Sequence, residues 1–503
     1  MTPDSLFLML LIAIGIATAY SAYRSSDDVS SVAMYLYAKD DDHGGITRSQ
    51  SWMNAVASNF QTASVLVVGI ELGFQFGLTM LWMALTFSWG IVLFKNMLKN
   101  STRDQLQHLY KSKSTPYTRM LPDATPIPKV MLHAAIYLAV LGTAIFEIWL
   151  TTELSRDIVS AFASRGAHLP IQSENIAYFL GAALTVVLLA YVFYGGYLAV
   201  VRTDRFQLSC IVMMLVAVAI GTAFSIAMAS SFETEKLIFG SSGSQILTWS
   251  FWALILGIIV LNIFWQLLDP QVWQRGQAAE SPEVFLASQG KNALFTFLTW
   301  SVPTVFGAAM AASGVSQDGF AASAPFVALL TLDNYFNLSN WFSSLSLAIA
   351  LAGIFAAALS SADTAIIAFV ADLPRFSNGA PPLSVVREKA ITVTILAAVF
   401  AGLLYWISPD IKNAIFAIYS GMMVFVYPMY KFIRSGAQHA IAGQKASNRL
   451  ALTFVTFVVA GVGANLIPAL REGLGPWVYV VPLLAILVGY LVCRGQFAEP
   501  KQN

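Results

Sequence analysis

Two serines, an aspartate and a threonine stand close together in the stretch SSADTAI, residues 360–366. The stretch lies inside an apolar run over about 345–371, which is long enough to cross a lipid bilayer as a helix. A carboxylate at the centre of a bilayer costs about 2.5–3.5 kcal/mol even on a lenient insertion scale. These polar residues therefore need a partner that offsets this cost.

The oxygen-bearing residues of this run are predicted to share one helix face. Positions i, i+3 and i+4 are neighbours on a helix, which groups Ala357, Ser360, Asp363 and Thr364, with Ser361 beside them. Hydroxyl, carboxylate and carbonyl oxygens are hard donors that suit alkali or alkaline-earth cations. Small hydroxyl residues also help helices to pack in membranes. That alternative explains the two serines but not the aspartate.

Buried acidic residues are a second indication of cation chemistry. Five of them lie within apolar runs or at their edges: Glu71, Glu147, Asp204, Asp269 and Asp363. Among the basic residues, only His133 falls in the interior of a predicted span. Buried acids without buried bases predict a positive partner from elsewhere, such as a transported cation or a proton. For Asp204 and Asp269, near predicted cytoplasmic ends, protonation or an interfacial position is an equally good interpretation.

Composition indicates the class of protein. The chain has 503 residues, of which 57% are hydrophobic and 11% are charged, whereas a soluble protein carries about 25% charged residues. A net charge of +1 does not favour nucleic acid as a partner. The two cysteines lie in apolar runs and are too few for a disulfide scaffold. Since the sequence has no nucleophile–base pair and no transition-metal pattern, we do not expect an enzyme.

Thirteen stretches are candidates for membrane spans, each of which needs about 20 apolar residues. They cover about 5–23, 52–76, 78–94, 130–151, 175–201, 206–230, 246–268, 293–313, 341–371, 390–407, 411–430, 451–469 and 476–493. With the N-terminus outside and the C-terminus inside, the loops place most of the 28 lysines and arginines in the cytoplasm, as the positive-inside rule requires. The exceptions are Arg156, Arg165, Lys236, Lys412 and Arg471. We predict an all-α polytopic membrane protein with a single integral membrane domain.

The second predicted span is unusual for a continuous helix. Its polar and flexible residues are Asn59, Gln61, Thr62, Ser64, Gly69, Gly73 and Gly77. Transporters use broken helices whose freed carbonyl groups coordinate ions near the middle of the membrane. A glycine-rich packing face is an equally good interpretation of this stretch.

Four stretches resemble motifs of the sodium:solute symporter family, which includes sodium/glucose and sodium/proline cotransporters. They are YLYAKDDDHGG after the first span, VFYGGYLAVVRTDRFQ at 192–207, NIFWQLLDPQVWQRGQAA at 262–279 and ALSSADTAI at 358–366. The second is similar to the family's Gly-Gly…Thr-Asp…Gln signature. The first departs from the family pattern, with Lys39 where arginine is usual.

The resemblance implies a leucine-transporter-type fold. Two inverted repeats of five spans, at 52–230 and 246–430, would follow a peripheral helix at 5–23 and precede two extra helices at 451–493. The first helix of each repeat would be broken near the membrane centre, where substrate and ions bind.

The family's sodium site, carried onto this chain, implies five ligands. They are the carbonyl groups of Asn59, Thr62 and Ala357 and the hydroxyls of Ser360 and Ser361. The two ligands from the second span follow from aligning Gly69 with the family's glycine.

Some family members bind a second sodium at the aspartate of the Thr-Asp signature. The resemblance places such a site here at Asp204, Ser360, Asp363 and Thr364. Because two bare carboxylates in low dielectric do not both stay ionised without a counter-charge, we expect Asp204 and Asp363 to share a second cation or one proton.

The resemblance also implies a solute site between spans 2, 4, 7 and 11. Its expected residues are Gln61, Leu66, Glu147, Asn262, Trp265 and Gln266. Trp265 falls where the sugar-transporting branch has an aromatic inner gate. Leu66 stands where that branch has glutamine, which disfavours a sugar. Glu147 and the lack of predicted buried bases favour a neutral or cationic solute, although a helix N-terminus can also hold a carboxylate.

The predicted function is sodium-coupled symport of a small neutral or cationic organic solute, by alternating access, across the cell membrane. Sodium would be the co-transported ion, without an organic cofactor, and proton coupling stays open. The expected partners are the solute and the lipid bilayer, and the expected state is a monomer or weak homo-oligomer. The alternative is a membrane sensor that works with a partner in trans, since some relatives join this fold to a histidine kinase.

Overall fold

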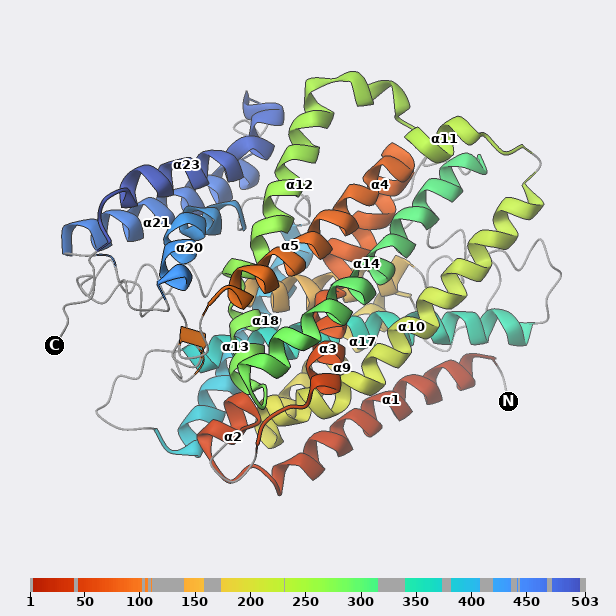
Figure 1. The fold of residues 1–503 in the computed structure, drawn as a ribbon. Helices are drawn as coiled ribbons and strands as arrows, with labels where there is room; N and C mark the ends of the chain where they lie inside the picture. Colours follow the sequence, from red (N-terminus) through yellow and green to blue (C-terminus); the bar gives the residue numbers. More distant parts are fainter. Residues whose placement is uncertain are drawn as a thin grey trace.

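A computed structural model of the chain shows a bundle of long helices (Figure 1). The structure describes residues 3–39, 44–101, 105–106, 110, 140–157, 173–229, 231–314, 340–372, 381–407, 419–435, 441, 444–467 and 473–497. Within these residues the only β-type pairs are two isolated bridges, Ile46–Ala279 and Ile441–Phe497. The predicted all-α class is therefore confirmed.

The second predicted span is a broken helix, as one interpretation of its polar residues expected. The N-terminal half contains α1 (Pro3–Ser26), α2 (Val32–Tyr37), α3 (Arg48–Asn59), the π-helix η1 (Thr62–Val67), α4 (Val68–Phe76), the 3-10 helix η2 (Gly77–Leu81), α5 (Trp82–Lys99), a helix over 140–157, α9 (Ser173–Tyr194) and α10 (Gly196–Met228). The break lies at residues 60–61, between α3 and η1. His133 and the first part of the predicted span 130–151 lie outside the described residues.

A second break interrupts the first helix of the second half. This half contains α11 (Thr234–Phe239), η3 (Gly243–Leu247), α12 (Trp249–Leu268), α13 (Pro270–Ala278), α14 (Pro282–Ala312), α17 (Asn340–Asp372), α18 (Leu383–Ile407), η4 (Met423–Phe425), α20 (Val426–Arg434), α21 (Gln444–Leu466), η5 (Gly475–Val480) and α23 (Val481–Cys493). Asp269 ends α12 and also caps the start of α13, where Pro270 occupies the first turn. A proline there fits because its missing amide has no helical partner to lose.

Several described helices are long and apolar enough to cross a membrane. Six stretches meet this description: Ser64–Lys99, Gly196–Ala223, Trp249–Ala278, Pro282–Ala312, Ala348–Ala371 and Gly475–Cys493. Large apolar side chains such as Val186, Val459 and Leu487 are exposed on the bundle. Hydrocarbon solvates such side chains, while the helices satisfy their own backbone groups. The chain is a multi-pass membrane protein.

The apolar helix α17 lies at the centre of the bundle. In its span Ala348–Ala371, 89% of the residues are buried, the highest share among the six spans. It packs against α10, α1 and α3. Its many alanines allow close backbone approach, which is how helices associate in membranes. The SSADTAI stretch is therefore held against α3 and α10 rather than against lipid.

Two consecutive glycines stand at the junction of α9 and α10. The predicted fifth span, 175–201, ends early, because α9 stops at Tyr194 and α10 begins at Gly196. Gly196 has φ +53°, and a Cβ at this residue would lie 2.5 Å from the Tyr35 carbonyl oxygen. A glycine is needed here on both counts. The turn sets the register of α10 and thus the position of Asp204.

The segment before α3 is tied to the turn between α13 and α14. Ile46 and Ala279 form a bridge, in which the Ile46 amide donates to the Ala278 carbonyl at 2.9 Å. Lys39 Nζ donates to the Ala279 carbonyl at 2.9 Å. Partial burial lowers the pKa of Lys39, while Glu280 partly offsets this effect. These contacts join the two halves of the chain next to both broken helices.

Candidate functional site

The break between α3 and η1 exposes backbone oxygens. Phe60 has φ −86° and ψ 81°, outside the helical region, so α3 ends at Asn59. In a continuous helix the Thr62 amide would donate to the Ser58 carbonyl, four residues earlier. It donates instead to Glu147 Oε2 at 3.0 Å. Glu147 is buried on the 140–157 helix, so it helps to fix the break and leaves the Ser58 carbonyl for another partner.

The hydroxyls of two α17 serines lie against carbonyl groups at the C-terminal end of α3. Ser360 Oγ is 2.9 Å from the Ala57 carbonyl oxygen and 3.1 Å from that of Ala357. Ser361 Oγ donates to the Ser58 carbonyl at 3.2 Å. All five residues are buried. We call these three carbonyl and two hydroxyl oxygens the α3–α17 oxygen cluster.

The expected sodium ligands are only partly brought together. The three from α17 belong to the α3–α17 oxygen cluster. The two from the second span do not, because the Asn59 carbonyl accepts a hydrogen bond from Trp300 Nε1 at 3.0 Å and Thr62 begins η1 beyond the break. The residues that face α17 are Ala57 and Ser58 instead. The carbonyl groups expected from the second span, those of Asn59 and Thr62, therefore lie outside the α3–α17 oxygen cluster.

Two buried carboxylates form a second polar group, between α10 and α17. Asp204 on α10 and Asp363 on α17 are fully buried and close enough for their charges to interact. Asp204 Oδ2 accepts a hydrogen bond from Asn54 Nδ2. Asp363 Oδ1 accepts a hydrogen bond from Thr364 Oγ1 at 3.3 Å. The remaining oxygens, Asp204 Oδ1 and Asp363 Oδ2, have no hydrogen-bond partner among the described residues.

Residues of α3 and α10 orient this carboxylate pair. Tyr197 Oη donates to Asn54 Oδ1 at 3.0 Å, which turns the Asn54 amide group toward Asp204. Ser58 Oγ lies 3.3 Å from Thr364 Oγ1. The same residue, Ser58, thus contacts the oxygen cluster through its carbonyl and the neighbourhood of the carboxylate pair through its hydroxyl.

A cavity of about 100 Å³ adjoins both helix breaks. Its polar lining residues are Ser58, Asn59, Gln61, Ser64, Asn262, Asp269 and Gln271, and its aromatic ones are Phe87, Trp265, Trp300 and Tyr419. The rings of Phe87 and Trp300 stack with centroids 4.1 Å apart, and those of Trp265 and Tyr419 meet edge to face at 4.4 Å. An apolar cavity of about 150 Å³ accommodates benzene. The present cavity is smaller than that and has polar as well as aromatic walls, so its size limits it to a small molecule.

Half of the residues expected at the solute site line this cavity. Gln61, Asn262 and Trp265 do so, and Asn262 Nδ2 also donates to the Met83 carbonyl on α5 at 3.0 Å. The others, Leu66, Glu147 and Gln266, are buried but do not belong to the cavity lining.

A buried arginine corrects one expectation from the sequence. Arg275 on α13 is only 2% exposed, and its Nη2 lies 3.9 Å from Asp269 Oδ2. Its Nε donates to the Gln271 carbonyl at 3.2 Å, and its Nη1 lies 3.5 Å from Asn59 Oδ1. The expectation of buried acids without buried bases is therefore wrong. The sequence places Arg275 in a cytoplasmic loop, because nothing in it shows that α13 stays inside the bundle after the break.

Two features of the candidate site, the second break and the aromatic walls, are absent from the predictions made from the sequence. The stretch of Asp269 and Pro270 carries a helix-start signal, an N-cap residue followed by proline, and Asp269 Oδ1 does accept the Gln271 amide at 2.9 Å. This signal could have located the second break. The aromatic walls at Phe87 and Trp300 carry no comparable pattern, since aromatic residues are frequent throughout this chain.

Comparisons with known proteins agree with this architecture. No protein-family model and no curated protein matches the chain. A Na+-coupled sialic acid symporter in a substrate-bound outward-open state matches with a TM-score of 0.67, 15% identity and 99% of each chain covered. Mhp1, a nucleobase-cation-symport-1 family transporter in a closed conformation, matches with a TM-score of 0.53, 12% identity and 92% of this chain and 94% of its own covered. MhsT in complex with L-phenylalanine matches with a TM-score of 0.50, 14% identity and 89% of this chain and 99% of its own covered. The chain has the leucine-transporter-type fold that its sequence predicted.

Proposed function

We propose that this protein is a sodium-coupled symporter that carries a small neutral organic solute by alternating access. The observation that carries the proposal is the α3–α17 oxygen cluster, in which hydroxyls of a central helix meet carbonyl groups next to a helix break. The resemblance in fold to a Na+-coupled sialic acid symporter supports it.

Sodium would bind at the α3–α17 oxygen cluster. Oxygen ligands suit this hard cation, and the C-terminal end of α3 adds the negative pole of its helix dipole. Ser360 and Ser361 now direct their hydroxyl hydrogens at carbonyl oxygens. When sodium enters, these hydrogens would rotate away and the oxygen lone pairs would face the ion. The bound ion would thus hold α3 against α17.

The carboxylate pair would take a second cation or one proton. Asp204 Oδ1 and Asp363 Oδ2 both lack hydrogen-bond partners among the described residues. Two ionised carboxylates near each other in a buried site repel strongly. A positive charge between them would remove this repulsion and use both free oxygens. Thr364 could add a hydroxyl ligand from the adjacent position.

The solute would bind in the cavity between the two breaks. Arg275 neutralises Asp269 at the cavity edge, and the remaining polar groups there are amides and hydroxyls. A neutral molecule with hydrogen-bonding groups and a compact apolar part matches this lining better than a cation does. Trp265 would form part of the gate, since its ring closes on Tyr419.

Transport would follow from the link between ion and solute. Sodium and solute both contact the α3 break, so each stabilises the conformation that the other binds. Release of sodium would then loosen α3 from α17 and open the cavity to the other side. Each charge that enters with the solute gains about 2.3 kcal/mol per 100 mV of membrane potential.

Uptake into proteoliposomes tests this function. Neutral solutes would first be screened by the sodium-dependent rise in melting temperature that a bound ligand causes. A hit should then accumulate in vesicles with an inward sodium gradient, and not with an equal gradient of potassium. A protein that binds the solute with sodium but never moves it across the bilayer would be a sensor, which would refute the proposal. Accumulation driven by a proton gradient alone would assign the coupling to protons.

A further inference from the structure

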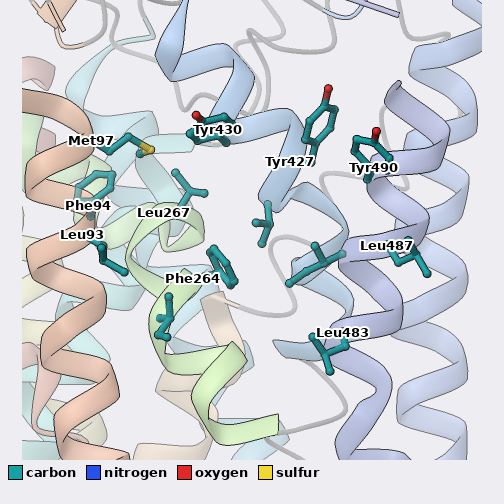
Figure 2. Close-up of a pocket in the computed structure, with 13 residues that line it drawn as sticks. Leu93, Phe94, Met97, Phe264, Leu267, Tyr427, Tyr430, Leu483, Leu487 and Tyr490 are labelled. Atoms are coloured by element: carbon teal, nitrogen blue, oxygen red, sulfur yellow. The ribbon is translucent and has the colours of Figure 1, made fainter. Parts of the chain in front are cut away.

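An apolar groove opens on the bundle surface, apart from the solute cavity. It has a volume of about 460 Å³ and is formed by α5, α12, α20 and α23 (Figure 2). Every residue that lines it is apolar or a tyrosine. Its wall includes Leu483 and Leu487, whose side chains are exposed. In a bilayer, such a groove faces hydrocarbon chains rather than water.

Three tyrosines gather at one end of the groove. Tyr427, Tyr430 and Tyr490 lie together there, while Leu483 lies toward the opposite end (Figure 2). The rings of Tyr427 and Tyr490 meet edge to face at 4.9 Å. Tyrosine is typical of the boundary between hydrocarbon and lipid headgroups. The groove therefore has an apolar end and an end at headgroup level.

Each of these tyrosines carries a basic side chain over its ring. Lys431 Nζ lies 5.9 Å from the ring centroid of Tyr427, and the guanidinium carbons of Arg434 and Arg494 lie 5.9 Å from those of Tyr430 and Tyr490. Each pair is four residues apart, so the cation stands one turn beyond its tyrosine. No carboxylate pairs with these three cations among the described residues.

The direction of the two helices places the cations at one membrane surface. Lys431 and Arg434 lie in the last turn of α20, and Arg494 directly follows α23. The charge distribution of the sequence predicts that this surface is cytoplasmic. The cytoplasmic leaflet is the one rich in anionic lipids.

We propose that this groove binds one anionic phospholipid. An acyl chain would lie along the apolar wall of α12 and α23, and the phosphate would accept hydrogen bonds from the tyrosine hydroxyls and from Arg434, Lys431 and Arg494. Cation–π contact orients the basic groups without neutralising them, so they stay available to phosphate. A neutral lipid would match the groove but leave the three charges unpaired.

Helix α12 lines both the groove and the solute cavity. On α12, Ile263, Phe264 and Leu267 line the groove, whereas Asn262 and Trp265 line the solute cavity. Lipid binding does not require the proposed transport function, and its test needs no transport assay.

Native mass spectrometry can count the bound lipid. The full chain would be reconstituted with equal amounts of phosphatidylglycerol and phosphatidylcholine, extracted in mild detergent and weighed intact. The wild type should retain one phosphatidylglycerol. A triple variant, Lys431→Gln, Arg434→Gln and Arg494→Gln, should lower the preference for phosphatidylglycerol about 100-fold, since each basic residue near a membrane surface contributes roughly fivefold.

A charge-matched control separates the groove from a general surface effect. Arg205→Gln, Lys389→Gln and Lys445→Gln together remove three basic residues from α10, α18 and α21, and this variant should retain the lipid as the wild type does. Leu487→Trp should fill the groove and reduce lipid retention while the basic residues remain. If the triple variant does not fold, Arg434→Gln alone should show a fivefold loss.

Four results would overturn the proposal. One is equal retention of phosphatidylglycerol and phosphatidylcholine by the wild type. Another is equal loss in the triple variant and its control. The third is full retention by Leu487→Trp, which would place the lipid outside the groove. A stable dimer that covers Leu483 and Leu487 would likewise assign the groove to a second copy of the chain.

Discussion

Removal of the two α17 hydroxyls, one at a time, is the sharpest test of the sodium site. Ser360→Ala and Ser361→Ala each delete one of the five oxygens in the α3–α17 oxygen cluster. A polar contact to a charged group is worth about 1.5–3 kcal/mol. Each variant should therefore raise the sodium dissociation constant about 10- to 150-fold.

The loss of sodium affinity must be separated from a loss of stability. Each variant also leaves a buried carbonyl without its hydroxyl donor, which costs about 1–3 kcal/mol whether or not sodium is present. Melting temperature measured over a series of sodium concentrations separates the two effects. The value without sodium reports stability, and the concentration at which it begins to rise reports the dissociation constant. Choline chloride would keep the ionic strength constant.

A matched serine outside the site provides the control. Ser447 on α21 is fully buried and lies far from SSADTAI in sequence. Because Ser447 Oγ has no hydrogen-bond partner among the described residues, Ser447→Ala should change the melting temperature without sodium little and should leave the sodium response unchanged. If Ser360→Ala and Ser361→Ala also keep the wild-type sodium response, sodium does not bind at the α3–α17 oxygen cluster and our reasoning about the break fails.

Further variants test the other groups. Trp265→Ala should weaken solute binding about 2- to 13-fold, because an aromatic pair contributes about 0.5–1.5 kcal/mol. Calorimetry measures the solute dissociation constant, and an unchanged value would exclude Trp265 from the gate. Arg275→Met should destabilise the fold by about 3–5 kcal/mol, since it leaves a buried carboxylate unpaired, and adding Asp269→Asn should restore part of the loss in thermal unfolding. Asp204→Asn and Asp363→Asn should each lower the Hill coefficient for sodium or abolish a pH dependence of uptake. Their double variant should be no worse than either, and additive effects would show that the two acids do not share an ion.

The sequence predicted the elements of the fold better than their contacts. Spans follow from the length and polarity of apolar runs, and the break in the second span follows from its polar residues and glycines. Which carbonyl faces α17 could not be predicted, because each residue turns a helix by about 100° and a shift of one or two positions changes the face. Asn59 was therefore expected in the oxygen cluster, whereas its carbonyl accepts from Trp300.

Which charged residues are buried, and with which partners, could be predicted only in part. Asp204 and Asp363 could be paired because a family motif and a helix stripe both pointed to the same place. The burial of Arg275 could not be predicted, because a basic residue after an apolar run has the pattern of a cytoplasmic loop charge. Only the turn at Asp269, which redirects the chain into α13, brings its guanidinium group back into the bundle. The preference for a neutral solute depends on this turn.

Ser58 shows how the three sites can depend on one another. Its carbonyl accepts from Ser361 in the oxygen cluster, and its hydroxyl lies 3.3 Å from Thr364 beside the carboxylate pair. The same residue lines the solute cavity. Its carbonyl is available only because Glu147 takes the Thr62 amide that a continuous helix would supply. A displacement of α3 away from α17 therefore changes all three sites at once, and the free energy that couples ion to solute must act in both directions.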